Sequence, residues 1–246
     1  MSHFHLPPEA WTADAKMLVL TGDEARHAAK VRRHRVGDVL SVLDGAGRRA
    51  VGGISVLEDD RVVIEVTEIH HTPLPGVPLT LVQAIPKGDT IEWIIEKAVE
   101  LGVAEIQPVI TERTIIRLDE KDALKKHQKW SRQLIEACKQ CGQTHFPRLH
   151  PVAPLKNVLP TLTDLPLRIV ASLEPRAQLL SGVLTEVAPS AAGLAIGPEG
   201  DFSPAEYDAF AEAGWKPWTL GHLTLRCETA AISAVAILRH QFSCPS

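Results

Sequence analysis

The sequence predicts an α/β protein in two parts, a small β-rich segment followed by a larger, mostly parallel sheet with helices. Two observations lead to this prediction. Residues 79–246 alternate short apolar runs with helical patterns, which is typical of a doubly wound parallel sheet. Residues 1–72 are instead rich in strand-forming runs separated by turn signals. The stretch 73–78 between them contains three prolines and is expected to be a stiff linker.

Three short runs define the β-rich segment. Val39–Leu43 precedes an Asp-Gly turn, and the runs Val51–Val56 and Val62–Val66 flank an acidic turn. Gly22–Val36 is the exception, because it reads as a short helix that carries basic residues. A small β-barrel with one helix is the expected arrangement.

The second part begins with a strand and helix that then recur. Leu79–Ile85 is an expected strand, and Thr90–Leu101 an expected helix with one apolar stripe, ended by Gly102. Ala104–Ile110 and Leu167–Leu173 are further expected strands. The predicted sheet therefore has several polar loops at the carboxyl ends of its strands.

A glycine-rich turn follows the apolar run Leu194–Ile196. The sequence Gly-Pro-Glu-Gly-Asp-Phe at 197–202 allows close backbone approach and unusual dihedral angles. Ser203 is then the expected N-cap of a helix, Pro204 its first residue, and Glu206 the partner that completes a capping box.

The same logic is repeated further along the chain. Trp218–Leu220 reads as a short strand, Gly221–Leu225 as a loop, and Arg226–Thr229 as the start of a helix. The helix body, Ala230–Leu238, is small and apolar on nearly every face, so it is expected to be buried. Two loops that leave neighbouring parallel strands would face each other at one sheet edge, where open α/β sheets bind ligands.

These two motifs carry a family resemblance. GPEGDFSPAE followed by LGHLTLRCETAAISA resembles the ribosomal RNA small-subunit methyltransferase E family, the uracil-N3 methyltransferase branch of the knotted SPOUT superfamily. The segments His27–Gly47, Glu96–Val103 and Thr111–Arg113 fit as well, so the resemblance covers essentially the whole chain. Asp201 stands where the family usually has glycine, and Arg32 and Cys227 also replace commoner residues.

The resemblance implies a fold and an activity. It implies a PUA-like RNA-binding β-barrel at 1–72 and, at 79–246, a SPOUT-type parallel sheet with a C-terminal trefoil knot. The implied activity is S-adenosylmethionine-dependent methylation of N3 of a specific uridine in the decoding region of 16S ribosomal RNA. The implied partners are 16S ribosomal RNA within the small ribosomal subunit and a second copy of the chain, since the family forms dimers through its knotted domain.

Site residues follow from the same resemblance and from simple chemistry. Because uracil N3 carries a proton, a base or an electrostatic helper is expected. Arg226 is the candidate for stabilising negative charge, while Glu199 and Glu228 are alternative proton acceptors or orienting groups for Arg226. A bent cofactor is expected in the loops after the strands that end near Leu173, Ile196 and Leu220. The expected cofactor residues are Leu173, Glu174, Ile196, Gly197, Gly200, Leu220, Gly221, Leu223 and Leu225.

The expected RNA contacts are basic. Residues 26–35 contain five Lys and Arg and no acid, and they can neutralise phosphates or simply form a solvated helix face. The resemblance favours the first interpretation. A second basic excess lies between 112 and 148. The expected RNA-binding residues are Arg26, Lys30, Arg32, Arg33, Arg35, Lys87 and Arg113.

Composition and absent motifs limit the alternatives. The chain has 246 residues and a formal net charge of −4, no apolar run near membrane-span length, and no signal-peptide pattern at its start, so a cytoplasmic protein is expected. Cys138 and Cys141 lack a second pair at zinc spacing, so packing roles are favoured and no metal is expected. Dinucleotide-binding, P-loop, serine-hydrolase and zinc-protease motifs are absent. The alternative functions are a non-catalytic RNA-binding relative and an ordinary α/β enzyme with a nucleotide ligand.

Overall fold

The computed structural model describes residues 2–11, 15–74, 76–184 and 189–243, which form two compact units. The first unit comprises 1–74 together with Ile135–Phe146, and the second comprises 75–134 together with 147–246. The boundary between residues 74 and 75 lies inside the expected linker 73–78. Residues 135–146 are grouped with the first unit, although they come later in the chain than the start of the second.

The first unit is built on one five-stranded sheet in the order β1-β3-β4-β5-β2. These strands are β1 (His3–His5), β2 (Met17–Thr21), β3 (Val39–Leu43), β4 (Arg48–Leu57) and β5 (Arg61–His71). The β1–β3 pair is parallel and the other pairs are antiparallel. The alternating residues of β2 show that one face of the sheet is buried, since Leu18 and Leu20 are buried while Met17 and Val19 on the other face are exposed.

The helical part of the first unit is shorter than the sequence predicted. Helix α1 (Gly22–Arg26) continues into a π-helical turn η2 (His27–Val31), and a 3-10 turn η1 covers Pro8–Ala10. The expected helix Gly22–Val36 stops early because Arg33 has a φ of 52°, which no right-handed helix accommodates. Strands β4 and β5 are longer than expected, and β5 includes His70 and His71.

The second unit contains a parallel seven-stranded sheet in the order β12-β10-β11-β6-β7-β8, with β9 also pairing with β7. The strands are β6 (Leu79–Ala84), β7 (Glu105–Ile110), β8 (Arg148–Leu149), β9 (Ala153–Pro154), β10 (Leu167–Ala171), β11 (Ala192–Ile196) and β12 (Lys216–Trp218). Every pairing is parallel, which confirms the predicted sheet type. Strands β6 and β11 are buried at every residue, as expected for the centre of a doubly covered sheet.

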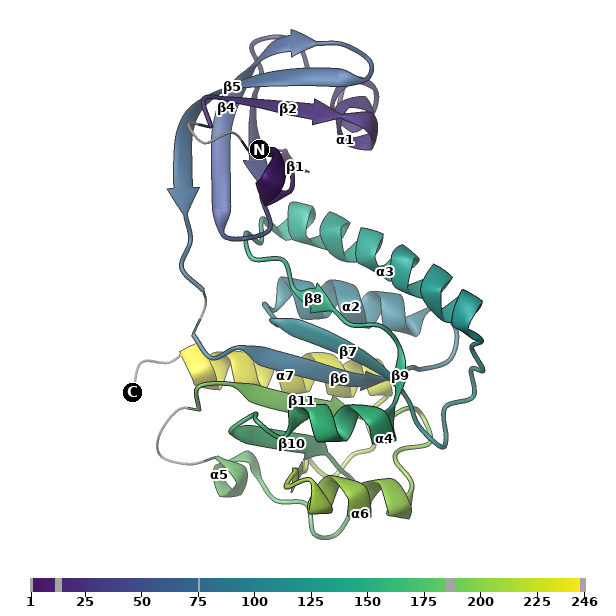
Figure 1. Cartoon of the computed structure of the whole chain (residues 1–246). Coiled ribbons are helices and arrows are strands. Elements are labelled where there is room, and N and C mark those ends of the chain that lie inside the picture. Colours follow the sequence, from purple (N-terminus) through teal and green to yellow (C-terminus); the bar gives the residue numbers. More distant parts are fainter. Residues whose placement is uncertain (1, 12–14, 75, 185–188, 244–246) are drawn as a thin grey trace. The chain divides into compact units, whose positions relative to one another are not determined.

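Helices cover both faces of this sheet (Figure 1). Helices α2 (Thr90–Glu100) and α7 (Cys227–Ser243) pack together on one face, where α7 contacts β6 and β11. Helix α4 (Leu155–Val158), the 3-10 turn η3 (Leu159–Leu162) and α6 (Pro204–Glu212) supply apolar side chains to the core on the other face. The remaining helices are α3 (Glu120–Cys141), which runs from the second unit into the residues grouped with the first, and α5 (Leu180–Val183).

The long helix α3 has a buried apolar stripe, and of the two cysteines expected to pack only Cys138 lies in it. Trp130, Leu134, Ala137 and Cys138 of α3 are buried, whereas Cys141 is exposed. Burial raises the pKa of the Cys138 thiol, so this group stays protonated. Among the described residues, no group of three or more His, Cys, Asp or Glu side chains could hold a metal ion. In the same part of the chain, none of the helices has the length and apolar character needed to span a membrane.

Candidate active site

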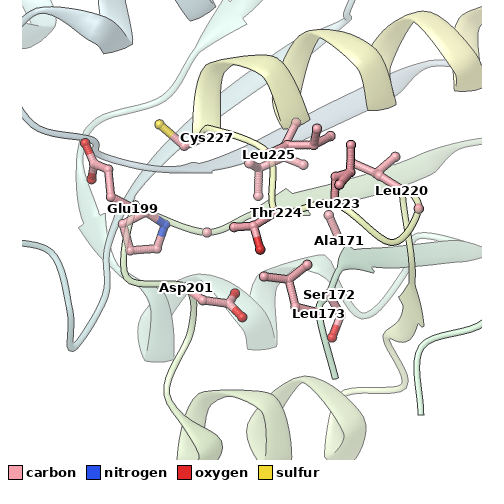
Figure 2. Close-up of a pocket in the computed structure, with 15 residues that line it drawn as sticks. Ala171, Ser172, Leu173, Glu199, Asp201, Leu220, Leu223, Thr224, Leu225 and Cys227 are labelled. Atoms are coloured by element: carbon pink, nitrogen blue, oxygen red, sulfur yellow. The ribbon is translucent and has the colours of Figure 1, made fainter. Parts of the chain in front are cut away.

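A pocket lies at the carboxyl ends of the neighbouring strands β12, β10 and β11, where three loops converge (Figure 2). Parallel strands in adjacent positions deliver their following loops to one sheet edge, so the strand order itself creates the pocket. The lining consists of Ala171, Ser172, Leu173, Ile196, Gly197, Pro198, Glu199, Asp201, Leu220, Gly221, Leu223, Thr224, Leu225, Cys227 and Ala230.

Most of the expected cofactor residues line this pocket. They are Leu173, Ile196, Gly197, Leu220, Gly221, Leu223 and Leu225. The two others lie beside the lining. Glu174 binds Arg176 at 2.9 Å, and the Gly200 carbonyl accepts a hydrogen bond from the Arg113 guanidinium at 2.6 Å.

The loop after β11 is held in place by its neighbours. The Lys87 backbone N–H donates to Glu199 Oε1 at 2.9 Å, and Arg113 reaches the Gly200 carbonyl. A Cβ on Gly200 would lie 3.4 Å from Arg113 Cδ, which is ordinary van der Waals contact, so the Arg113 side chain packs directly over this glycine. Two expected RNA-binding residues, Lys87 and Arg113, thus brace the pocket loop through Lys87's backbone and Arg113's side chain.

The unusual backbone angles of these loops belong to two residues. Gly221 has a φ of 124°, which side-chain-bearing residues rarely adopt. Asp201 has a φ of 62°, in the left-handed region. The expectation of unusual dihedrals at the glycines of the Gly-Pro-Glu-Gly turn is wrong, because Gly197 and Gly200 have no positive φ and the left-handed residue is Asp201, which follows the turn.

The helix that follows the pocket loop starts as the sequence predicted. The Ser203 hydroxyl accepts from the Glu206 N–H, and Glu206 Oε2 accepts from the Ser203 N–H at 2.9 Å, which completes the capping box. Glu206 does more than was predicted, since its Oε1 also accepts from the Glu112 N–H at 2.8 Å. This carboxylate therefore ties the loop after β7 to the start of α6.

The three expected catalytic residues are placed differently. Glu199 lines the pocket and is exposed at its rim, while Arg226 and Glu228 flank the lining residue Cys227. Glu228 Oε2 accepts from the Cys227 thiol at 3.3 Å. Burial, with help from this hydrogen bond to Glu228, raises the pKa of Cys227 to about 12, so the thiol remains neutral rather than acting as a nucleophile.

Sequence reasoning missed part of the lining. Ala171 ends β10 and Ser172 follows it, Thr224 and Cys227 lie in and after the loop that follows β12, and Asp201 follows the Gly-Pro-Glu-Gly turn. Position directly after a strand was the available signal for Ser172. Nothing in the sequence alone told which way Asp201 or Thr224 would point.

The basic candidates of the first unit form a separate group. Arg26, Arg32, Arg33 and Arg35 are exposed, as is Lys30. Arg26 pairs with Asp23, and Lys30 pairs with Asp59 at 3.0 Å. Within the described part of the chain, the side chains of Arg32, Arg33 and Arg35 have no ion pair.

Comparison with known proteins identifies the family. Residues 72–239 match the RNA methyltransferase domain family, and residues 20–67 match the RNA methyltransferase PUA domain family. The Bacillus subtilis ribosomal RNA small subunit methyltransferase E is 30% identical over 237 residues, which cover 93% of this chain and 91% of that protein. The Aquifex aeolicus protein of the same name is 30% identical over 90% of this chain and 93% of its own length.

Solved structures agree with this assignment. The Neisseria gonorrhoeae ribosomal RNA small subunit methyltransferase E, bound to S-adenosyl methionine, superposes with a TM-score of 0.87 at 31% identity over 98% of both chains. A putative methyltransferase from Legionella pneumophila in complex with the same cofactor gives 0.86 at 29% identity over 97% of both chains. The chain belongs to the ribosomal RNA small subunit methyltransferase E family of RNA methyltransferases, with a PUA domain before its methyltransferase domain.

Proposed function

We propose that this protein uses S-adenosylmethionine to methylate N3 of a specific uridine in the decoding region of 16S ribosomal RNA. The observation that carries the proposal is the pocket at the ends of β10, β11 and β12, in a chain whose close structural relatives were solved with this cofactor. The expected cofactor residues from three separate stretches of sequence converge there.

The lining suits the chemistry of the cofactor. Apolar side chains such as Leu173, Leu223 and Leu225 offer a surface for an adenine ring, and Gly221 has open space where a side chain would stand. Ser172 and Thr224 provide hydroxyl groups, while Asp201 provides negative charge for a cationic ligand. The residues present therefore fit S-adenosylmethionine, whose sulfonium supplies an already activated methyl group.

The chain's own residues then have positioning and proton-handling roles. With an activated donor, alignment of the acceptor supplies much of the rate enhancement. We assign proton removal from uracil N3 to Glu199, because this exposed residue lines the pocket while its carboxylate points away from Thr224 and Leu173, where a base could approach. The bond from the Lys87 N–H holds Glu199 Oε1 and so orients this carboxylate.

We propose that Arg226 and Glu228 assist Glu199, the first by stabilising charge and the second by orienting its neighbours. Arg226 is exposed just before α7, so its guanidinium can stabilise negative charge on a uracil carbonyl oxygen. Glu228 lies in the first turn of α7, where the helix dipole favours a carboxylate. We assign it the orienting role in this part of the site.

RNA binding is proposed for the basic residues of the PUA-containing unit, with Lys87 and Arg113 near the chemistry. Phosphate contacts from these residues would position the RNA without reading its sequence. The proposal includes assembly as a homodimer, 16S ribosomal RNA within the small subunit as the substrate, and therefore a cytoplasmic site of action. The trefoil knot of the methyltransferase domain remains part of the proposal.

The decisive experiment is methyl transfer to small-subunit RNA. Purified protein is incubated with labelled S-adenosylmethionine and either small ribosomal subunits or free 16S RNA from cells that lack the enzyme. Label in one nucleotide, identified by mass spectrometry as 3-methyluridine, is the expected result. Label at another atom or base would overturn the uridine-N3 assignment. Binding of both cofactor and RNA without transfer would favour the non-catalytic alternative.

A further inference from the structure

Asp201 is the pocket residue whose side chain was not anticipated. It follows the Gly-Pro-Glu-Gly turn, lines the pocket and is half-buried. Its φ of 62° is a conformation that glycine adopts freely and that aspartate tolerates better than most residues. In Figure 2 its carboxylate points toward the side of the pocket lined by Thr224 and Leu173, whereas the Glu199 carboxylate points away from that region.

The carboxylate is fixed by hydrogen bonds from the next residue of the loop and from helix α6. The Phe202 N–H and the Tyr207 hydroxyl both donate to Asp201 Oδ1, each at 2.8 Å. Burial of Tyr207, followed by its bond to Asp201, raises the pKa of that phenol, so it remains a donor. Both bonds end on one oxygen, and the side chain therefore has a defined direction.

A neighbouring glycine makes room for this arrangement. A Cβ on Gly197 would lie 3.2 Å from Asp201 Oδ1 and 3.4 Å from Phe202 Cδ2. The first distance is tighter than most real side-chain contacts, so a side chain at this position would press on the carboxylate. The loop backbone is thus packed directly against the carboxylate, which further limits its movement.

We propose that Asp201 is a specificity-determining residue that favours the cationic methyl donor over its neutral product. The inference rests on the proposed function. In the reaction, the carbon–sulfur bond breaks with its electron pair left on sulfur, a carbon–nitrogen bond forms at uracil N3, and the N3 proton passes to a base. The sulfonium charge is lost, so the product, S-adenosylhomocysteine, has one positive charge fewer than the donor. A fixed carboxylate in the pocket attracts the donor more strongly than the product.

Two substitutions separate charge from shape. Asp201→Asn keeps a side-chain oxygen and tolerates the left-handed backbone, but it is neutral. Asp201→Gly removes the side chain at a φ of 62° that suits glycine, so the loop is expected to keep its path. The control is Asp208→Asn, which neutralises an exposed carboxylate on α6 outside the pocket lining.

The measurement is calorimetric binding of S-adenosylmethionine and of S-adenosylhomocysteine to each protein, with no RNA present. Both Asp201 variants should lower the ratio of the product's Kd to the donor's Kd by about threefold to tenfold, a range typical of a partly solvated ion pair. The parent's ratio should fall as salt is added, because salt screens this attraction. Asp208→Asn should keep the parent's ratio.

The outcomes are distinguishable. If both Asp201 variants bind the two compounds with the parent's ratio, the inference is wrong while the proposed function stands. An equal weakening of both compounds would also overturn it, because that result indicates a contact to a group that donor and product share. A parent protein that binds neither compound would overturn the proposed function and the inference together.

Discussion

At the scale of single residues, Glu199 tests the chemistry most directly. Its Oε1 accepts the Lys87 N–H, and a glutamine at this position would keep an oxygen for that bond. Glu199→Gln is therefore expected to leave cofactor affinity within about twofold while lowering the methyl-transfer rate about 100-fold, the usual loss for a general base. Single-turnover transfer to small subunits and calorimetry measure the two quantities.

Glu228→Gln is the matched variant for this experiment. It removes the same charge from the first turn of α7, where Glu228 accepts from the Cys227 thiol. We expect a smaller rate loss, about tenfold, because an orienting role is indirect. A normal rate in Glu199→Gln together with a large loss in Glu228→Gln would transfer proton removal to Glu228.

Gly221 tests the loop after β12. A Cβ at this position would meet no atom within 4 Å, so the cost of substitution is backbone strain at a φ of 124° and not a clash. In Gly221→Val the strained loop is expected to relax in the free protein, and regaining the binding shape then costs roughly 1–3 kcal/mol. S-adenosylmethionine binding should therefore weaken at least about tenfold. Calorimetry checks the affinity and circular dichroism checks the fold.

Gly53→Val is the control for that substitution. Gly53 lies in β4, has no positive φ and has open space at its Cβ position. Cofactor affinity should stay at the parent's value in this variant. An unchanged affinity in Gly221→Val as well would place the cofactor elsewhere.

The sequence predicted the position of those site residues that belong to a recognisable motif. The turn at Gly197 follows the buried strand β11, and the turn at Gly221 comes after β12, which ends at Trp218 and not at Leu220 as expected. Position after a strand puts both turns at a ligand-binding sheet edge. Asp201 shows what could not be predicted. Its pocket-facing direction depends on a left-handed backbone and on bonds from Phe202 and Tyr207, none of which has a signature in local composition.

At the scale of elements, the hydrogen bonds at the start of α6 stabilise the fold next to the pocket loop. Ser203 and Glu206 exchange capping hydrogen bonds, and Glu206 also accepts from the Glu112 N–H. Ser203→Ala should lower the free energy of unfolding by about 1 kcal/mol, the usual value of an N-cap. Glu206→Ala should cost more, about 2 kcal/mol, because it leaves two backbone donors without their carboxylate.

Chemical denaturation of these variants measures the effect, with Asp208→Ala as the comparison. Asp208 is exposed on the same helix and takes no part in the capping box. Its substitution should change the unfolding free energy by less than about 0.5 kcal/mol. Equal losses in Ser203→Ala and Asp208→Ala would show that helix propensity, and not capping, sets the stability of this segment.

Elements were predictable in type but less so in extent. The helix Thr90–Leu101 and the strands on either side of it appear nearly as expected, because their apolar periodicity is strong. The expected helix Gly22–Val36 fails after Val31, since basic residues without periodicity gave no sign of the left-handed Arg33. The strand order β12-β10-β11-β6, which creates the pocket, depends on long-range packing that local patterns do not encode.

At the scale of the whole molecule, the apolar residues around the pocket-bearing loops predict a homodimer. Leu173, Leu179 and Leu223 are 55%, 70% and 65% exposed, and Ile237 of α7 is 42% exposed. These exposed side chains are therefore the candidates for the dimer interface that the family resemblance implies. Sedimentation should give a dimer at micromolar concentration.

Ile237→Glu tests which surface is used. It should raise the dimer dissociation constant at least about tenfold, because a charge would be placed in an apolar contact. Leu124→Glu is the control, since Leu124 is also exposed, at 59%, but lies on α3 away from α7. A parent protein that sediments as a monomer would contradict the prediction, and dissociation by Leu124→Glu alone would move the interface to α3.

RNA binding also belongs to the whole molecule, because two basic stretches compete for it. Three of the five lysines of α3 are paired in the structure: Lys125 with Asp122 at 3.9 Å, Lys129 with Glu92, and Lys139 with Glu24 at 2.6 Å. Arg32, Arg33 and Arg35 instead have no ion pair among the described residues. A paired lysine must leave its carboxylate before it can neutralise a phosphate, whereas an unpaired arginine can do so at once. The arginines are therefore the stronger candidates.

Replacing Arg32, Arg33 and Arg35 together by alanine should therefore weaken binding to small-subunit RNA and flatten its salt dependence. Each lost phosphate contact lowers the slope of log K against log salt by about 0.7 to 0.9, so the triple variant should lose about two units. Cofactor affinity should be unchanged, because these residues belong to a different unit from the pocket. Filter binding over a salt series measures the slope. If the triple variant keeps the parent's affinity and slope while Lys121, Lys125 and Lys126 replaced together by alanine do not, the RNA is held by α3 instead.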